Sequence, residues 1–318
     1  MKSAELVIEE ERMLVRFRKI LCPIDFYSAS RRAFEYALKL AENYEAGIEL
    51  LHVVSPIIPS VYGSAVSLSD LTTQFQEQAT KQLEVFRRRV ERKHLPVNAE
   101  VVIGDVDAEI RRAIASSKPD LVVVGTRGRR GFERWVLGSV TERLLRHCPV
   151  PLLVIGSNGA NRMVPPAIAR MVVTTDFSAG TADAMNYAFS IAGESQSKVT
   201  LLHVVNDDAS DMRTTAREPL LRNIRTELES LVPVEAREWC EVRTRIESGT
   251  PWRAILKTIQ SEKPGMLVMN VHGKGMLDRA LVGSTAERVL RGSCCPVLLI
   301  PPMKAGKVQR AKVKRQAA

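Results

Sequence analysis

The chain carries the same glycine-rich pattern twice, which indicates an internal duplication. In the first copy an apolar run, a glycine-rich turn, nine further residues and a Gly-Ser pair follow one another at residues 121–124, 125–128 and 138–139. In the second copy the same order is found at residues 266–269, 270–273 and 283–284. A strand that ends in a glycine-rich loop has the size and backbone freedom needed to hold a phosphate.

Other landmarks repeat with a slightly different spacing. Asp25 corresponds to Asp176 and His52 to His203, each 151 residues apart, whereas the glycine-rich patterns are 145 residues apart. The second copy therefore lacks a net six residues between its histidine and its glycine-rich pattern.

A chain of 318 residues is long for one domain and sufficient for two that each bury a core. The 45% of hydrophobic residues and 26% of charged residues are ordinary for a globular protein. No apolar run approaches the roughly 18 residues that span a bilayer, and Glu9, Glu10 and Glu11 stand where a signal peptide would be apolar. We expect no membrane span and a cytoplasmic location.

The net charge of +10 is concentrated at one end of the chain. Six of these charges belong to Lys304, Lys307, Arg310, Lys312, Lys314 and Arg315, which leaves +4 for the rest. A short basic tail without aromatic residues is usually solvated. Because most of the net charge lies in this tail, we do not expect a nucleic-acid partner. The five cysteines contain no C-x-x-C spacing and fit reduced thiols, with Cys22, Cys294 and Cys295 expected in strands.

Hydrophobic periodicity predicts strands that alternate with helices in both copies. Strands are expected at residues 18–24, 48–54, 99–103, 121–124, 150–155, 171–174, 198–205, 240–246, 266–270 and 296–300. Helices are expected at residues 28–44, 71–90, 107–116 and 139–147, and in the second copy as helices ending at residues 192, 231, 260 and 291. The second helix should bury Leu71, Phe75, Ala79, Leu83, Phe86 and Val90, which recur at helical spacing.

This alternation predicts two α/β domains, each with a parallel sheet covered on both faces. The first domain should span residues 17–156 and the second 168–302. The polar, proline-containing stretch 157–167 reads as a linker. Residues 1–16 form an N-terminal extension with a predicted helix at 5–16, and residues 303–318 form the basic tail.

Ligands of open parallel sheets bind beyond the carboxyl ends of the strands, near the point where the strand order reverses. In the first copy Asp25, the turn that begins at Gly125 and the helix that begins at Ser139 converge there. Backbone amides and the nearby Arg127, Arg129 and Arg130 would hold a polyphosphate. Because a carboxylate such as Asp25 accepts hydrogen bonds from a ribose hydroxyl or a base amine, the combination favours a nucleotide.

Each of these features also has a purely structural interpretation. Ser139-x-x-Glu142 and Ser284-x-x-Glu287 have the spacing of helix capping boxes. Asp25 and Asp176 could serve only the amides of the turns that follow them. The joint occurrence of the features is what favours nucleotide binding.

The long motif around Gly125 and Ser139, together with Pro23-x-Asp25 and the His52 strand, resembles the ATP-binding signature of universal stress proteins. The likeness covers both copies. It implies two tandem flavodoxin-like (Rossmann-like) domains, each a five-stranded parallel sheet of order 3-2-1-4-5 flanked by helices, and an intramolecular pseudo-dimer of the two, with a homodimer as a further option. It also implies a first ATP site at Pro23, Asp25, Gly125, Arg127, Gly128, Arg129, Gly138 and Ser139, and a weaker second site at Asp176, Asn270, Gly273, Lys274, Gly283 and Ser284.

The second copy departs from the family pattern in the loop itself. Asn270 stands where the motif has glycine, and we expect its side chain to intrude on the space that Gly125 leaves open. His272 and Lys274 replace two arginines and carry less fixed charge, and Gly265 replaces Asp120. The first site should therefore bind ATP more tightly.

The chain lacks the usual equipment of phosphoryl transfer, since it has no G-x-x-x-x-G-K-[ST] loop and no catalytic base near the expected phosphates. His52 and His203 read as hydrogen-bonded strand-end residues rather than catalytic ones, and no cluster has metal-ligand spacing, so Mg²⁺ would arrive only with the nucleotide. We expect an ATP-binding regulatory or protective protein of the stress response. A slow ATPase or adenylate-transferring enzyme, or a nucleotide-free interaction module, are the alternatives.

Overall fold

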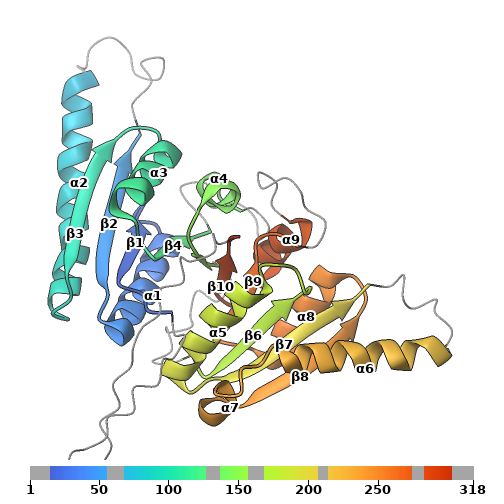
Figure 1. Ribbon diagram of the computed structural model, residues 1–318. Coiled ribbons are helices and arrows are strands. Elements are labelled where there is room, and N and C mark those ends of the chain that lie inside the picture. Colours follow the sequence, from blue (N-terminus) through green and yellow to red (C-terminus); the bar gives the residue numbers. More distant parts are fainter. Residues whose placement is uncertain are drawn as a thin grey trace, which may run out of the picture.

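The computed structural model describes residues 15–55, 68–126, 137–156, 168–206, 214–273 and 283–302. Strands and helices alternate throughout (Figure 1). The first copy contains β1 (Lys19–Pro23), α1 (Ser28–Tyr44), β2 (Gly47–Val54), α2 (Leu68–Glu91), β3 (Val97–Ile103), α3 (Val106–Ser117), β4 (Leu121–Gly125), α4 (Ser139–His147) and β5 (Leu152–Ile155). The second contains β6 (Arg170–Thr175), α5 (Thr181–Ser195), β7 (Lys198–Val205), α6 (Thr214–Ser230), α7 (Ala236–Trp239), β8 (Val242–Ser248), α8 (Pro251–Glu262), β9 (Met266–Asn270), α9 (Ser284–Gly292) and β10 (Val297–Ile300).

Both copies have the strand order that the family resemblance implies. The first runs β3-β2-β1-β4-β5 and the second β8-β7-β6-β9-β10, which is the order 3-2-1-4-5 twice. All pairs within a copy are parallel. The predicted flavodoxin-like α/β fold is thereby confirmed, and the strand order reverses between β1 and β4 and between β6 and β9.

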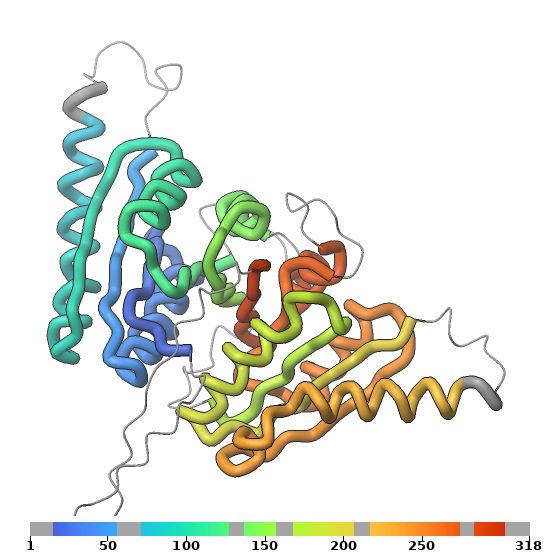
Figure 2. The backbone as a smooth tube through the Cα atoms, viewed as in Figure 1, coloured from blue at the N-terminus to red at the C-terminus, as the bar shows by residue number. Residues whose placement is uncertain are grey.

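The two half-sheets join edge to edge through β5 and β10, which pair antiparallel with Leu153 opposite Leu298. The described strands therefore form one ten-stranded sheet. Figure 2 shows the blue-to-green first copy on one side of this junction and the yellow-to-red second copy on the other. The side chains of β5 and β10 are buried on both faces of the sheet, so their apolar contacts stabilise the junction.

Buried side chains form one cluster on each face of the sheet. The first joins α1, α2, α5 and α6 to one face, and the second joins α3, α4, α8 and α9 to the other. Phe17 links the copies within the first cluster, since its ring lies 5.0 Å from that of Tyr44 and 6.0 Å from that of Tyr187. The Val15 amide also donates to Ser190 Oγ at 2.7 Å, so the segment before β1 contacts α5 of the second copy.

The apolar face of α2 is only partly buried, which corrects one expectation. Ala79, Leu83, Phe86 and Val90 lie in the core, but Phe75 is 44% exposed. The first turns of α2 extend past the end of the sheet (Figure 1), so they have no strand to pack against. Periodicity shows which side of a helix is apolar, but not how far its neighbours extend.

Other segments also differ from the sequence-based expectations. Cys294 and Cys295 lie in the turn before β10 rather than in a strand, and the short helix α7 was not expected. Of the helix predicted at residues 5–16, only Val15 and Arg16 are among the described residues, and neither is helical.

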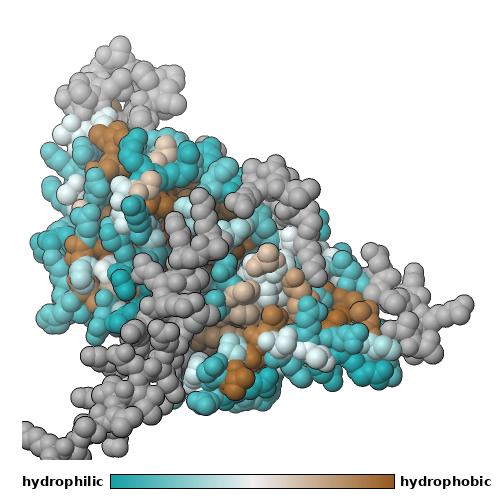
Figure 3. All heavy atoms as spheres, in the orientation of Figure 1, coloured by the Kyte–Doolittle hydropathy of each residue, from teal (hydrophilic) through white to brown (hydrophobic). Residues whose placement is uncertain are grey.

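The surface in the space-filling view is mostly hydrophilic, with apolar residues in small separate patches (Figure 3). Among the described residues no helix is both long enough and apolar enough to cross a membrane.

Candidate functional site

The turn after β1 is held by Asp25. Its Oδ1 accepts hydrogen bonds from the Tyr27 amide at 3.0 Å and from Ser30 Oγ at 2.5 Å. The structural interpretation of Asp25 as a turn residue is therefore correct, but both bonds use the same carboxylate oxygen. An aspartate whose turn bonds involve Oδ1 alone can still present Oδ2 to a ligand.

His52 supports this turn from the end of β2. Its Nδ1 lies 2.6 Å from the carbonyl oxygen of Ile24, and its ring stacks on Phe26 at 4.4 Å between centroids. Phe26 adopts a left-handed backbone conformation with φ of 65°, which is strained for a bulky residue, and the stacking compensates for that strain. The side chain of His52 is buried in these contacts, which confirms the prediction of a hydrogen-bonded strand-end histidine.

The second copy repeats this device. His203 Nδ1 lies 2.8 Å from the carbonyl oxygen of Thr175, and its ring lies 4.6 Å from that of Phe177, whose φ is 58°. Asp176 Oδ1 accepts from the Ser178 amide at 3.0 Å. Both copies therefore position an aspartate at the strand end in the same way.

The end of β4 lies against the start of α1. Strands β1 and β4 are neighbours, with Ile20 opposite Leu121, so the loops that follow them share one edge of the sheet. A Cβ built on Gly125 would stand 2.5 Å from the carbonyl carbon of Ala29 and 2.7 Å from its oxygen. Glycine is therefore required at position 125 for the approach of α1, whether or not a ligand is bound.

Hydrogen bonds join the two ends of the loop after β4, which we call the loop neck. The Gly138 amide donates to the carbonyl oxygen of Thr126 at 2.7 Å, and Thr141 Oγ1 donates to that of Gly125 at 3.1 Å. The Gly138 amide is thus already used within the protein, so it contributes shape rather than a donor to the expected phosphate site. Arg127, Gly128, Arg129 and Arg130 lie outside the described residues.

Helix α4 begins without a side-chain cap, which corrects the capping-box interpretation. Its N-cap is Gly138, and Ser139 is the first helical residue, where a hydroxyl cannot cap the helix. Glu142 pairs instead with Arg146 at 3.1 Å. Ser139 is exposed, and no side chain caps the amides of the first turn, so this end of the helix can bind an anion at the carboxyl ends of the strands.

The second copy has the same helix start. Gly283 is the N-cap of α9 without a side-chain bond, its amide donates to the carbonyl oxygen of Val271 at 3.1 Å, and Glu287 pairs with Arg291. Ser284 is exposed like its counterpart. Lys274 lies outside the described residues.

The second copy makes room for the Asn270 side chain because the residue packed against it is smaller than its counterpart in the first copy. This corrects the expectation that the side chain intrudes. Gly180 takes the place of Ala29, and a Cβ on Gly180 would stand 3.2 Å from the Asn270 side chain. Asn270 Nδ2 points toward Ser178 Oγ at 3.5 Å, and its Oδ1 is buried without a hydrogen-bond partner among the described residues. The signal was present in the sequence, because aligning the two copies pairs Ala29 with Gly180 as well as Gly125 with Asn270.

The aspartate of the second copy lies close to the glycine-rich turn. A Cβ on Gly273 would stand 2.8 Å from Asp176 Oδ2, so glycine leaves room for the carboxylate there. This proximity narrows the space between the two loops of the second copy.

The difference between Asp120 and Gly265 lies away from both candidate sites. Asp120 Oδ2 accepts from the amides of Arg18 and Lys19 at 2.7 and 3.0 Å, at the amino end of β1. It fixes the start of a strand, at the opposite edge from Gly125. The described residues contain no cluster of His, Cys, Asp and Glu that could hold a metal ion, so these residues offer donors to an anion but no metal centre.

Comparison with known proteins agrees with this architecture. The model of the universal stress protein family matches residues 16–156 and 168–301. A universal stress protein of Methanocaldococcus jannaschii is 30% identical over 142 residues, which cover 44% of this chain and 82% of the relative. A universal stress protein of Mycolicibacterium smegmatis is 25% identical over 297 residues, which cover 89% of this chain and 97% of the relative.

A solved structure is similar along nearly the whole chain. The universal stress protein of Archaeoglobus fulgidus aligns with a TM-score of 0.65 at 24% identity, and the alignment covers 91% of this chain and 98% of that one. This likeness shows the fold. Since the family model matches both copies, the chain belongs to the universal stress protein family.

Proposed function

We propose that the first copy binds ATP and that the protein acts as a nucleotide-binding regulatory or protective protein in the stress response. The observation that carries the proposal is the uncapped start of α4. The exposed Ser139 and the first-turn amides stand at the same sheet edge as Asp25. A helix N-terminus favours phosphate, and a carboxylate nearby favours a ribose hydroxyl or a base amine.

The proposed first site consists of Pro23, Asp25, Gly125, Arg127, Gly128, Arg129, Gly138 and Ser139. Within it Gly125 and Gly138 shape the loop, since one admits α1 and the other closes the loop neck. Ser139 and its neighbouring amides would meet the phosphates, Asp25 would meet the nucleoside, and Mg²⁺ would enter with the nucleotide.

The proposed second site, at Asp176, Asn270, Gly273, Lys274, Gly283 and Ser284, binds ATP more weakly. Two observations support this order. The Asp176 carboxylate lies close to Gly273, which reduces the room that a polyphosphate would need. His272 and Lys274 also carry less fixed charge than the two arginines that they replace.

We further propose that the two copies act as an intramolecular pseudo-dimer of domains spanning residues 17–156 and 168–302, in the cytoplasm. The antiparallel pairing of β5 with β10 supports the first point, and the five cysteines without a disulfide suit the second.

The proposal is tested by placing a negative charge at the start of α4. Ser139→Glu should weaken Mg-ATP binding at least tenfold in titration calorimetry, because the carboxylate repels phosphate. It should leave folding intact, because an acidic residue suits the first turn of a helix. Ser284→Glu is the matched control and should leave the tighter site unchanged.

Equal ATP affinity in Ser139→Glu and the unaltered chain would refute the site. Accumulation of ADP over hours would show that the same site also hydrolyses ATP.

A further inference from the structure

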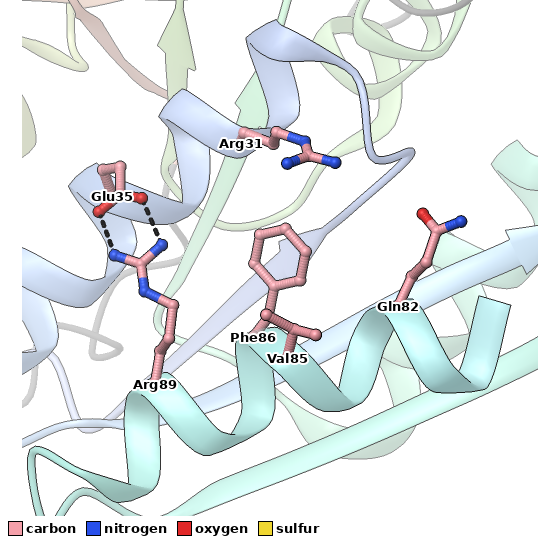
Figure 4. A pocket seen from close by; sticks show the side chains of 6 residues that line it. All are labelled: Arg31, Glu35, Gln82, Val85, Phe86 and Arg89. Carbon is pink, nitrogen blue, oxygen red and sulfur yellow. Dashed lines mark hydrogen bonds and ion pairs between the residues drawn. The ribbon is translucent and has the colours of Figure 1, made fainter. Parts of the chain in front are cut away.

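A groove of about 440 Å³ lies between α1 and α2 on the outer side of the first copy (Figure 4). Arg31 and Glu35 line it from α1, and Gln82, Val85, Phe86 and Arg89 line it from α2. Its volume is in the range of pockets that hold small molecules.

The floor of the groove is apolar. The Phe86 ring points from α2 toward α1 and packs edge-on against Phe34 at 4.9 Å. Val85 beside it is 59% exposed. Phe86 itself is buried, so a hydrocarbon or aromatic group would cover mainly Val85.

The two ends of the groove differ in charge. At one end Arg89 forms two hydrogen bonds with Glu35, at 2.6 and 2.7 Å, so their charges cancel. At the other end Arg31 is held by a bond from its Nε to the carbonyl oxygen of Phe26 at 2.8 Å, and its guanidinium lies 5.9 Å from the centre of the Phe86 ring. No carboxylate of the described residues forms an ion pair with Arg31, so the groove presents one uncompensated positive charge.

The charged α1 side of the groove differs from the equivalent part of the second copy. The counterparts of Arg31 and Glu35 on α5 are Ala182 and Asn186, which carry no charge. A feature required only by the fold would be expected in both copies of the duplication.

From these observations we propose that the groove binds a small amphipathic carboxylate. Its single negative charge meets the two terminal nitrogens of Arg31, and its apolar body lies on Phe86 and Val85. A bidentate guanidinium–carboxylate contact fixes the orientation, and burial of the apolar body supplies much of the affinity.

This groove shares a wall with the proposed nucleotide turn but does not depend on it. Arg31 bonds to the carbonyl group of Phe26, the residue after Asp25. A carboxylate that draws Arg31 toward the groove therefore pulls on the turn that positions Asp25. Binding of the carboxylate itself requires no ATP, so the two proposals fail separately.

Octanoate is a suitable probe, titrated below its micellar concentration into the full chain and followed by calorimetry. We expect saturable binding of one octanoate per chain and at least fivefold weaker binding in Arg31→Gln. Arg92→Gln is the matched control, since Arg92 is an exposed arginine at the end of α2, outside the groove. Val85→Asp should also weaken binding, because it places a charge on the apolar floor.

Three results would overturn the proposal: no saturable octanoate binding, equal affinity in Arg31→Gln, or equal affinity for octylammonium, which carries the opposite charge on the same tail. Sedimentation of Val85→Asp provides a further test. A change of oligomeric state without a change in octanoate binding would assign the groove to a protein contact and refute the small-molecule site.

Discussion

The backbone of Gly125 approaches Ala29 so closely that a Cβ at position 125 would stand 2.5 Å from the carbonyl carbon of Ala29. The contact joins the end of β4 to the first turn of α1, and thus fixes the two loops that frame the first candidate site relative to each other. A substitution at Gly125 therefore changes the packing of α1 before it changes any ligand contact.

We expect Gly125→Ala to lower the free energy of unfolding by about 1–3 kcal/mol, because the methyl group overpacks a rigid backbone contact. Urea denaturation measures the change. Gly47→Ala is the control, since its Cβ would meet Pro96 at an ordinary 3.5 Å. Equal stability of Gly125→Ala and Gly47→Ala would contradict the contact.

The paired exchange in the second copy predicts a coupling between Asn270 and Gly180. Gly180→Ala alone should crowd Asn270, whereas Asn270→Gly alone should leave a void. The double variant restores the pair found in the first copy, so it should be more stable than the sum of the single effects by about 0.5–2 kcal/mol. A double-mutant cycle in urea measures this energy, and strict additivity would show that the two side chains do not influence each other.

Loss of the His52 side chain should destabilise the turn that carries Asp25. His52→Ala removes the bond to the Ile24 carbonyl group and the stacking on Phe26, for which we expect a cost of about 2 kcal/mol. His147→Ala, at an exposed position near the end of α4, should change stability by less than about 0.5 kcal/mol. If the two variants unfolded at the same urea concentration, His52 would have no supporting role.

The buried thiols predict how stability responds to alkaline pH. Burial raises the pKa of Cys148 to about 11 and that of Cys295 to about 12, from an ordinary value of 9.0. The thiols therefore ionise at lower pH in the unfolded chain than in the folded protein. Their contribution to the free energy of unfolding is fully present below about pH 9, and it is lost as the pH rises toward 11 and 12. Urea denaturation at pH 8 and pH 10 should show the loss, and Cys148→Ala should reduce it. An identical decrease in Cys148→Ala would assign it to other groups.

The sequence was informative where a feature depends on neighbours along the chain. The apolar run before Gly125 and the spacing to Ser139 predict β4, its loop and α4, and the duplication predicts the same arrangement around Asn270. Strand alternation together with the family resemblance gives the order of both half-sheets.

The features that sequence reasoning missed depend on contacts between distant segments. The fit of Asn270 rests on Gly180, 90 positions earlier in the chain, and the exposure of Phe75 depends on where the sheet ends. Ser139 has the spacing of a capping serine, yet Gly138 takes the cap position because its amide closes the loop neck. In each case the sequence gives the residue type, but it does not give the contact partner that decides the role of that residue.

The antiparallel contact between β5 and β10 has a directional consequence. The strands of the two copies run in opposite directions. The loops after β1 and β4 therefore lie at one end of the strands in the sheet, and the loops after β6 and β9 lie at the other end. Molecules held by the two halves would therefore lie at opposite ends of the strands rather than beside each other.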